Sequence, residues 1–266
     1  MSTEYYADIG IIGGTGIYDS EFFSKNQEVK VHTPYGSPSD LITIGEYAGK
    51  KIAFIPRHGR NHRIPPHRIN NRANIWALKQ MGVKRIVAPT AVGSMNLEFK
   101  PGDITIPDQF VDFTKGRQYT FYDGDQVCHI SLADPFCREL RNIVNNVKDL
   151  KYNLHPNATY ICVEGPRFST RAESRFYRDV VKADIIGMTL VPECQLSREA
   201  KICYLSIATV TDYDVWADLA VTSKEIIRTL HNNVEKAKKL IGLIIDKIPP
   251  ERSNCTCAHA LEESLV

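Results

Sequence analysis

The chain has 266 residues, of which 43% are apolar and 24% charged, and its formal net charge is +2. These values are ordinary for a globular protein, and so small a charge gives no reason to expect nucleic acid or an anionic membrane as the main partner. No apolar run reaches the roughly 18 residues of a membrane-spanning helix, and the first residues lack the pattern of a signal peptide. We therefore expect a cytoplasmic enzyme.

Segments typical of buried strands alternate with amphipathic helices along most of the chain. Residues 202–210 are mostly apolar or β-branched, as in a strand covered on both faces. Thr170-Arg-Ala-Glu173 has the pattern of a capping box, and Asp134-Pro135 is typical of a helix start. The other predicted strands are 8–12, 41–44, 51–56, 85–91, 101–106, 159–163 and 184–189, and the other predicted helices are 71–81, 191–200 and 222–248.

This alternation predicts an α/β fold, a single domain whose mixed, mostly parallel central sheet is flanked by helices. We place the domain at residues 1–250, because Pro249-Pro250 ends the last helix, and we treat 251–266 as a C-terminal tail. The tail contains Cys255-Thr-Cys257, which are either two incidental thiols or members of a disulfide. No spaced His or Cys completes a zinc pattern with them, so no metal site is expected.

Residues suited to chemistry follow several predicted strands and form two groups. One group is cationic and rich in hydroxyls: Gly13-Gly-Thr-Gly16, the arginine-rich segment that begins at Arg57, and Thr90. Glycine backbone and arginine side chains both suit a small anion such as phosphate. The other group is Asp212 and Asp214, which an extended segment would point the same way. The pair either shares a proton, with one pKa raised by the other charge, or only caps a turn in a solvated loop.

Six motifs, in order and at compatible spacing, resemble the 5′-methylthioadenosine phosphorylase family, which belongs to the nucleoside phosphorylases of the trimeric-unit type. The resemblance extends from about Asp8 to the last predicted helix and leaves out only the tail. The motifs are Gly13-Gly-Thr-Gly16, Arg57-His-Gly59, Pro89-Thr-Ala-Val-Gly-Ser94, Glu164-Gly-Pro-Arg-Phe-Ser169, Met188-Thr189 and Thr211-Asp-Tyr-Asp-Val-Trp216.

The resemblance implies a nucleoside phosphorylase fold and phosphorolysis of methylthioadenosine to adenine and 5-methylthioribose 1-phosphate, with phosphate as co-substrate and no cofactor. It assigns Asp212 and Asp214 to N7 and the 6-amino group of the base; relatives that take inosine and guanosine have Asn in place of Asp212. His129 resembles a residue that reaches a neighbouring subunit's site, which implies a homotrimer or a dimer of trimers. The implied phosphate ligands are Thr15, Arg57, His58, Thr90, Ala91 and Thr189, and the implied nucleoside contacts are Phe168, Met188, Ile226 and Ile227.

Three other functions stay open on the sequence. The nearest is a broader purine nucleoside phosphorylase acting on adenosine or inosine, because Ser223 stands where the family has an apolar residue beside the methylthio group. A nucleotide-binding oxidoreductase is indicated only by the glycine turn at Gly13, and an RNA-binding module only by the basic segment 57–72.

Overall fold

The structure, a computed structural model, describes residues 5–14, 17, 24–217, 223–253 and 255–266, with the backbone alone described at 25–26 and 223–227. Within these ranges eleven strands form one sheet, in the order β2-β3-β4-β1-β5-β10-β9-β7, and β11 joins β5 to the short pair β6 and β8. The strands are β1 (Ile9–Gly13), β2 (Ser24–Val29), β3 (Ile42–Tyr47), β4 (Lys50–Pro56), β5 (Arg85–Ser94), β6 (Ile104–Thr105), β7 (Gln109–Phe113), β8 (Leu154–His155), β9 (Thr159–Val163), β10 (Ile185–Gly187) and β11 (Cys203–Asp212).

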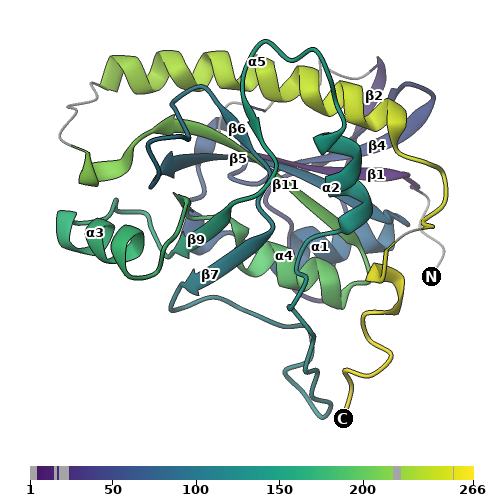
Figure 1. Cartoon of the computed structure of the whole chain (residues 1–266). Coiled ribbons are helices and arrows are strands. Elements are labelled where there is room, and N and C mark those ends of the chain that lie inside the picture. The colour runs from purple at the N-terminus through teal and green to yellow at the C-terminus, as the bar shows by residue number, and fades with distance from the viewer. Residues whose placement is uncertain (1–4, 15–16, 18–23, 218–222, 254) are drawn as a thin grey trace.

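Helices cover both faces of this sheet (Figure 1). They are α1 (Asn71–Gln80), α2 (Arg138–Asn145), α3 (Arg171–Asp179), α4 (Leu190–Glu199) and α5 (Ser223–Lys247), with short 3₁₀ turns at Arg60–His62, Pro66–Arg68, Asp214–Trp216 and Cys257–His259. Helices α2 and α5 pack on one face, and α1 and α4 on the other. The predicted single α/β domain with a mixed, mostly parallel sheet is therefore confirmed.

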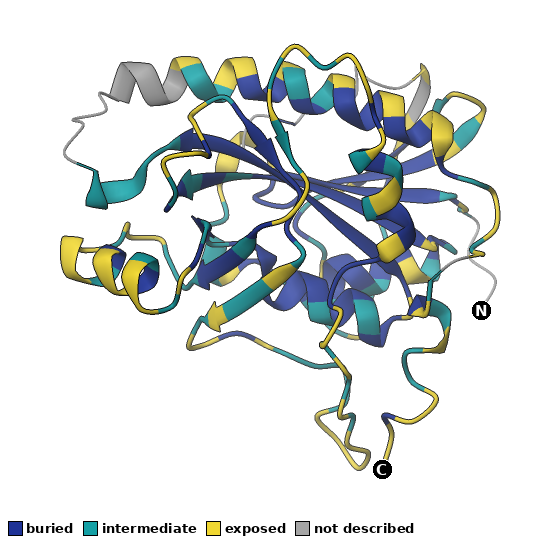
Figure 2. Ribbon diagram, in the orientation of Figure 1, coloured by how far each residue is buried: buried dark blue, intermediate teal, exposed yellow. Residues whose placement is uncertain are grey.

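Side chains of β11 alternate between two hydrophobic cores, one on each face of the sheet. Leu205 and Ile207 pack on the side of α2 and α5, whereas Tyr204 and Ala208 pack on the side of α1 and α4. The two central strands β5 and β11 are consequently buried over almost their whole length, as Figure 2 shows. This alternation follows from the two-residue period of a strand and explains why apolar residues occur on both faces of the two strands.

Strand β5 is the centre of the sheet because three strands pair with it. β1 runs parallel to its first residues, β11 runs parallel along its whole length, and β10 runs antiparallel to its last residues. Because β10 runs in the opposite direction, its carboxyl end meets the middle of β5 instead of its tip. Polar residues that follow β10 therefore lie beside polar residues within β5.

Two predicted helix starts have different outcomes. The capping box is confirmed: Thr170 accepts a hydrogen bond from the Glu173 backbone at 3.1 Å, and Glu173 accepts one from the Thr170 backbone. The predicted start at Asp134 is wrong, since α2 begins at Arg138 with Cys137 as its N-cap. The Cys137 backbone N–H donates instead to the carbonyl of Tyr204 at 3.0 Å, which holds this segment extended against β11.

The tail packs against a protruding loop of the body. Val127 and Val266 exchange backbone hydrogen bonds at 3.3 and 3.1 Å, and the N–H of His129 donates to the carbonyl of Ser264 at 2.7 Å. Both segments therefore lie in the protrusion at the end marked C in Figure 1. None of the helices in the described ranges combines the length and apolarity needed to cross a bilayer.

Candidate active site

The candidate site lies beside β5, at the carboxyl ends of β4, β10 and β11. Arg57 and His58 directly follow β4, Met188 and Thr189 follow β10, and Asp212 is the last residue of β11. Thr90 and Ala91 belong to β5 itself. The sheet topology thus brings together the two groups of residues that are far apart in the sequence.

A buried ion pair between Arg57 and Glu193 forms the floor of this site. The guanidinium donates through Nε and Nη2 to the two carboxylate oxygens of Glu193, at 2.8 Å each, and both side chains are at most 1% exposed. Burial opposes the charged form, but the carboxylate of Glu193 raises the pKa of Arg57, which therefore keeps its charge. Tyr204 donates its hydroxyl to the same carboxylate at 2.5 Å.

Two carbonyls take further N–H groups of Arg57 and leave one for a ligand. Nη1 donates to the carbonyl of Pro89 at 3.2 Å and Nη2 to that of Ile12 at 3.3 Å. With the two bonds to Glu193, four of the five N–H groups are used within the described residues. The fifth N–H group is on Nη1. This atom lies close to Gly14, because a Cβ atom added at Gly14 would be 3.1 Å from it.

Two threonine hydroxyls lie together beside this arginine. Thr90 Oγ1 and Thr189 Oγ1 are 3.0 Å apart and both side chains are buried. Beneath them Tyr160 is fully buried, and its hydroxyl has no hydrogen-bond partner among the described residues. Gly187 makes room for that hydroxyl, because a Cβ at this position would be 1.9 Å from it. Two hydroxyls and one N–H group form a cradle suited to an oxyanion.

His58 is neutral in this environment. Burial, and then the charge of Arg57, lower the pKa of His58 to about 4. Its Nδ1 lies 2.9 Å from the carbonyl of Ile64, so Nδ1 carries the proton and Nε2 is left as an acceptor. The ring stacks on His62, with 4.1 Å between the ring centroids.

Asp212 and Asp214 lie together, but the predicted reason is wrong. The chain bends at Tyr213 into a 3₁₀ turn, and Asp214 has a φ of +46°, so the two residues are not on one extended segment. Instead, Asp212 Oδ1 accepts the backbone N–H of Asp214 at 2.8 Å. Its Oδ2 accepts the hydroxyl of Thr211 at 2.6 Å.

Asp214 lies in a partly buried environment. Burial, together with the charge of Asp212, raises the pKa of Asp214, although the hydroxyl of Ser174 donates to its Oδ2 at 2.6 Å. Gly93 of β5 makes room for both aspartates: a Cβ there would be 3.2 Å from Asp212 Oδ1 and 3.4 Å from the Cβ of Asp214. Asp212 therefore ends the sheet and Asp214 packs against it from the following turn, and both residues are half-buried.

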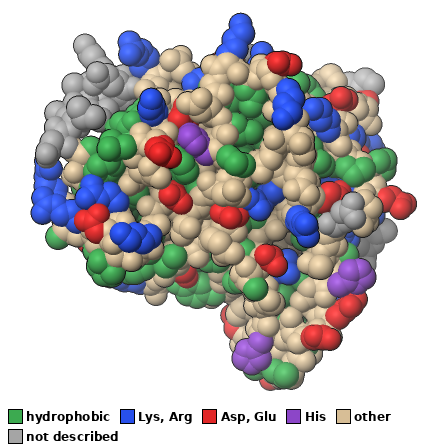
Figure 3. Space-filling view, viewed as in Figure 1, with side chains coloured by type: hydrophobic (Ala, Val, Ile, Leu, Met, Phe, Trp, Pro, Cys, Tyr) green, Lys and Arg blue, Asp and Glu red, His purple; other side chains and the backbone are tan. Residues whose placement is uncertain are grey.

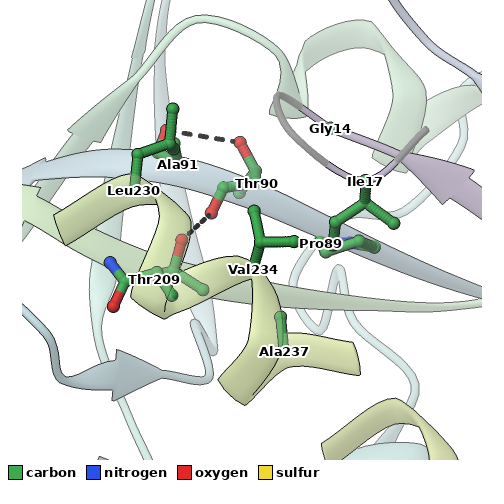
Figure 4. A pocket seen from close by; sticks show the side chains of 10 residues that line it. Gly14, Ile17, Pro89, Thr90, Ala91, Thr209, Leu230, Val234 and Ala237 are labelled. Carbon is green, nitrogen blue, oxygen red and sulfur yellow. Dashed lines mark hydrogen bonds between the residues drawn. The ribbon is translucent and has the colours of Figure 1, made fainter. Parts of the chain in front are cut away.

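A small pocket extends from Thr90 and Thr209 toward α5. Figure 4 shows Leu230, Val234 and Ala237 of α5 facing Thr90 and Ala91 of β5 across it. Its lining is mostly apolar, with one polar group that has no partner among the described residues, the Oδ1 atom of Asn233. The Nδ2 group of Asn233 donates to the carbonyl of Val210 at 2.8 Å.

Some predicted site residues are not part of this constellation in a single chain. Phe168 is 77% exposed in the loop after β9, and His129 is exposed on the protruding loop. Met188 lies against Gly165, which precedes Phe168, and so connects that loop to the end of β10. Thr15 and the side chains of Ile226 and Ile227 lie outside the described residues.

The basic segment after Arg57 is largely neutralised by carboxylates. Arg60 pairs with Glu28 and Asp40, Arg63 with Asp40 at 3.2 Å, and Arg72 with Asp123 at 2.6 Å. On the face seen in Figure 3, positive and negative side chains are interspersed. The segment therefore supplies Arg57 and His58 to the site, and its paired arginines do not form the continuous positive surface that RNA binding requires.

Sequence reasoning missed three buried residues that shape the site. They are Glu193, the partner of Arg57; Tyr160, below the two threonines; and Asn233, in the cavity wall. Glu193 and Asn233 occupy predicted helices and Tyr160 a predicted strand. For Glu193 the sequence offered one signal, an acidic residue among the apolar residues of a predicted helix. For Tyr160 and Asn233 it offered none.

Known proteins with the same fold are similar over almost the whole chain. A model of the phosphorylase superfamily matches residues 8–246. The S-methyl-5′-thioadenosine phosphorylase of Nitrosopumilus maritimus is 60% identical over 97% of both chains, and that of Hyperthermus butylicus is 57% identical over 98% of this chain and 96% of its own.

Two solved structures give the same result. A methylthioadenosine phosphorylase from an antarctic soil metagenomic library is 44% identical, with a TM-score of 0.92, over 99% of this chain and 93% of its own. A variant of the adenosine/methylthioadenosine phosphorylase of Schistosoma mansoni, in complex with methylthioadenosine, is 36% identical with a TM-score of 0.85. The match covers 92% of this chain and 93% of that one.

Replacement Glu193→Gln should lower the free energy of unfolding by about 3–5 kcal/mol, because it leaves the charge of Arg57 buried without a counter-ion. The control Tyr204→Phe removes one hydrogen bond but keeps the ion pair, so it should cost about 1 kcal/mol. Urea unfolding of both variants measures the difference. Equal losses in the two variants would contradict a dominant role of the ion pair.

The low pKa of His58 predicts a pH-dependent contribution to stability. Since the pKa is 6.5 in the unfolded chain and about 4 in the folded one, protons bind the unfolded state preferentially as the pH falls from 6.5 to 4. Over this range the free energy of unfolding of the wild type should fall by up to about 3 kcal/mol more than that of His58→Asn. The control variant can keep the hydrogen-bond donor to the carbonyl of Ile64. Parallel stability curves from unfolding at each pH would refute this.

Proposed function

Because the chain belongs to the phosphorylase superfamily, among the S-methyl-5′-thioadenosine phosphorylases, we propose that it converts 5′-methylthioadenosine and phosphate to adenine and 5-methylthioribose 1-phosphate. The reaction breaks the bond between C1′ and N9 and forms one between C1′ and a phosphate oxygen. The enzyme is thus a pentosyltransferase that serves purine and methionine salvage. We propose that inorganic phosphate is its only co-substrate and that no cofactor takes part.

The register of β5 and β11 is the observation that carries this proposal. Asp212 is the partner of Gly93, three residues beyond Thr90 on the same strand. At about 3.3 Å per residue, the oxyanion cradle and the carboxylates are separated by about 10 Å along the sheet. That spacing leaves room for a ribose with phosphate on one side and the purine on the other.

We assign phosphate to the cradle of Arg57, Thr90 and Thr189, with Thr15, His58 and the backbone of Ala91 as further ligands. Dianionic phosphate below the sugar would stabilise the positive charge that develops on the ribose as the glycosidic bond breaks. Since His58 is neutral with Nε2 as an acceptor, we assign it to the hydroxyl of monoprotonated phosphate.

The leaving adenine must gain a proton at N7 while it accepts the electron pair of the glycosidic bond. We assign Asp212 as the general acid that shares this proton, and Asp214 as the acceptor for the 6-amino group. A 6-oxo purine would point lone pairs at Asp214, so hypoxanthine should be rejected because a buried polar group would be mispaired. We place Phe168 and Met188 beside the base and ribose.

The apolar cavity below α5 is suited to the methylthio group, and Ile226 and Ile227 are proposed to extend it. One observation favours a second substrate. Asn233 Oδ1, which no described residue pairs with, could accept a hydrogen bond from the 5′-hydroxyl of adenosine, and this supports a broader purine nucleoside phosphorylase as the alternative function.

We further propose a homotrimer or a dimer of trimers in the cytoplasm, with no nucleic acid or membrane partner. His129 is exposed on the protruding loop, as expected if it reaches the site of a neighbouring subunit. The side chains of Val127, Leu265 and Val266 around it are exposed and apolar, which is typical of an interface. Seven cysteines without a disulfide support a reducing compartment.

Release of free base from methylthioadenosine, adenosine and inosine, each with and without phosphate, tests the proposed function. We expect phosphate-dependent release of adenine, fastest from methylthioadenosine, and no release from inosine. Comparable turnover of adenosine would favour the broader function. Release without phosphate would indicate a hydrolase and contradict the assignment of the cradle.

Replacement Asp212→Asn should lower kcat for methylthioadenosine by about 10²–10⁴-fold, because the group that shares the N7 proton is lost. The KM for phosphate should change little, since the cradle is about 10 Å away along β5. Steady-state kinetics beside the control Asp125→Asn, on the exposed loop, measure both constants. A near-normal kcat would exclude Asp212 as the acid.

A further inference from the structure

Four cysteines from three separate segments meet at the end of the sheet opposite the candidate active site. Cys137 is the N-cap of α2, Cys203 is the first residue of β11, and Cys255 and Cys257 belong to the tail. Their four sulfur atoms all lie within 4.8 Å of one another. Cys137, Cys203 and Cys257 are at most 4% exposed.

The spacing of these sulfurs is that of metal ligands. The Sγ atoms of Cys203 and Cys255 are 3.4 Å apart, well beyond the 2.0 Å of a disulfide bond. In a tetrahedral zinc site with Zn–S bonds of about 2.3 Å, neighbouring sulfurs are about 3.8 Å apart. That value falls between the 3.4 Å of this pair and the 4.8 Å limit of the whole cluster.

The backbone around the cluster is held in place by contacts that do not involve the thiols. The N–H of Cys137 donates to the carbonyl of Tyr204, which fixes the start of α2 on the start of β11. Arg252 donates to the carbonyl of Lys201 at 2.6 Å, and the N–H of Ser253 donates to the carboxylate of Glu139 at 3.2 Å. The ligand positions are thus largely organised before any metal binds.

We propose that Cys137, Cys203, Cys255 and Cys257 bind one zinc ion in a closed, tetrahedral structural site. Four thiolates fill the coordination sphere, so no open position is left for catalysis. Binding releases the protons that the thiols carry and requires no oxidant. The ion lies about 30 Å along β11 from Asp212, because the strand has ten residues. This proposal is therefore independent of the proposed reaction.

The site would attach the tail to the body of the protein. Cys255 and Cys257 precede the residues that pair with Val127 and His129, so the same ion would also support the protruding loop. Loss of the metal should consequently weaken thermal stability more than it changes the chemistry of the active site.

Metal analysis of the full chain, produced with zinc in the medium and purified with a reductant, tests the proposal. We expect about one zinc per chain in the wild type and in the control Cys162→Ser, a buried cysteine outside the cluster. Cys203→Ser and Cys257→Ser should bind at least tenfold less zinc. A strong chelator should lower the thermal midpoint of the wild type, with recovery when zinc is added back.

A second measurement decides the question if a serine variant does not fold. Wild-type protein stripped of metal under reducing conditions should bind one Co²⁺ and develop the absorption of tetrahedral cobalt thiolate, which zinc then abolishes. Less than a tenth of a zinc per chain with no cobalt spectrum would overturn the proposal. So would a thiol count of three in place of seven on protein purified without reductant and then denatured, because the four cysteines would then form two disulfides.

Discussion

The buried ion pair of Arg57 and Glu193 is the interaction on which the site depends. An arginine without solvent is costly to bury, and the bidentate carboxylate, with two backbone carbonyls, compensates for that cost and fixes the direction of the guanidinium. One N–H group, on Nη1 beside Gly14, then has no partner among the described residues. Because the residues of the pair come from the end of β4 and from α4, the same contact also holds that helix on the sheet.

The second constraint is the position of β10 beside β5. Because β10 runs antiparallel to β5, the hydroxyl of Thr189, just after β10, lies 3.0 Å from that of Thr90 in the middle of β5, whereas a parallel strand would carry it past the edge. The register of β11 is irregular after Val210, and the chain turns at Asp214. As a result, the side chains of Asp212 and Asp214 both lie beside Gly93 of β5. The site is consequently built on strands, whose spacing is rigid, and the loops add the remaining contacts.

The opposite end of β11 has a different role. There Cys203 meets Cys137 and the tail, and a structural ion would attach the C-terminus without touching the reaction. One strand would thus carry a structural site at its first residue and a catalytic carboxylate at its last.

The sequence by itself determined the fold class, most strands and helices, the family, and the residues of the anion and aspartate groups, because periodicity, caps and motifs are local properties of the chain. Only the tertiary structure decided that Glu193 neutralises Arg57, that Tyr160 and Asn233 lie beside the ligand groups, and that Cys137 and Cys203 complete the Cys255-Thr-Cys257 pair. It also showed that a hydrogen bond and a left-handed residue, not an extended strand, bring Asp212 and Asp214 together. Arg57 and Glu193, for example, are 136 positions apart in the sequence. No local pattern encodes such contacts, because they follow from which strands become neighbours in the sheet.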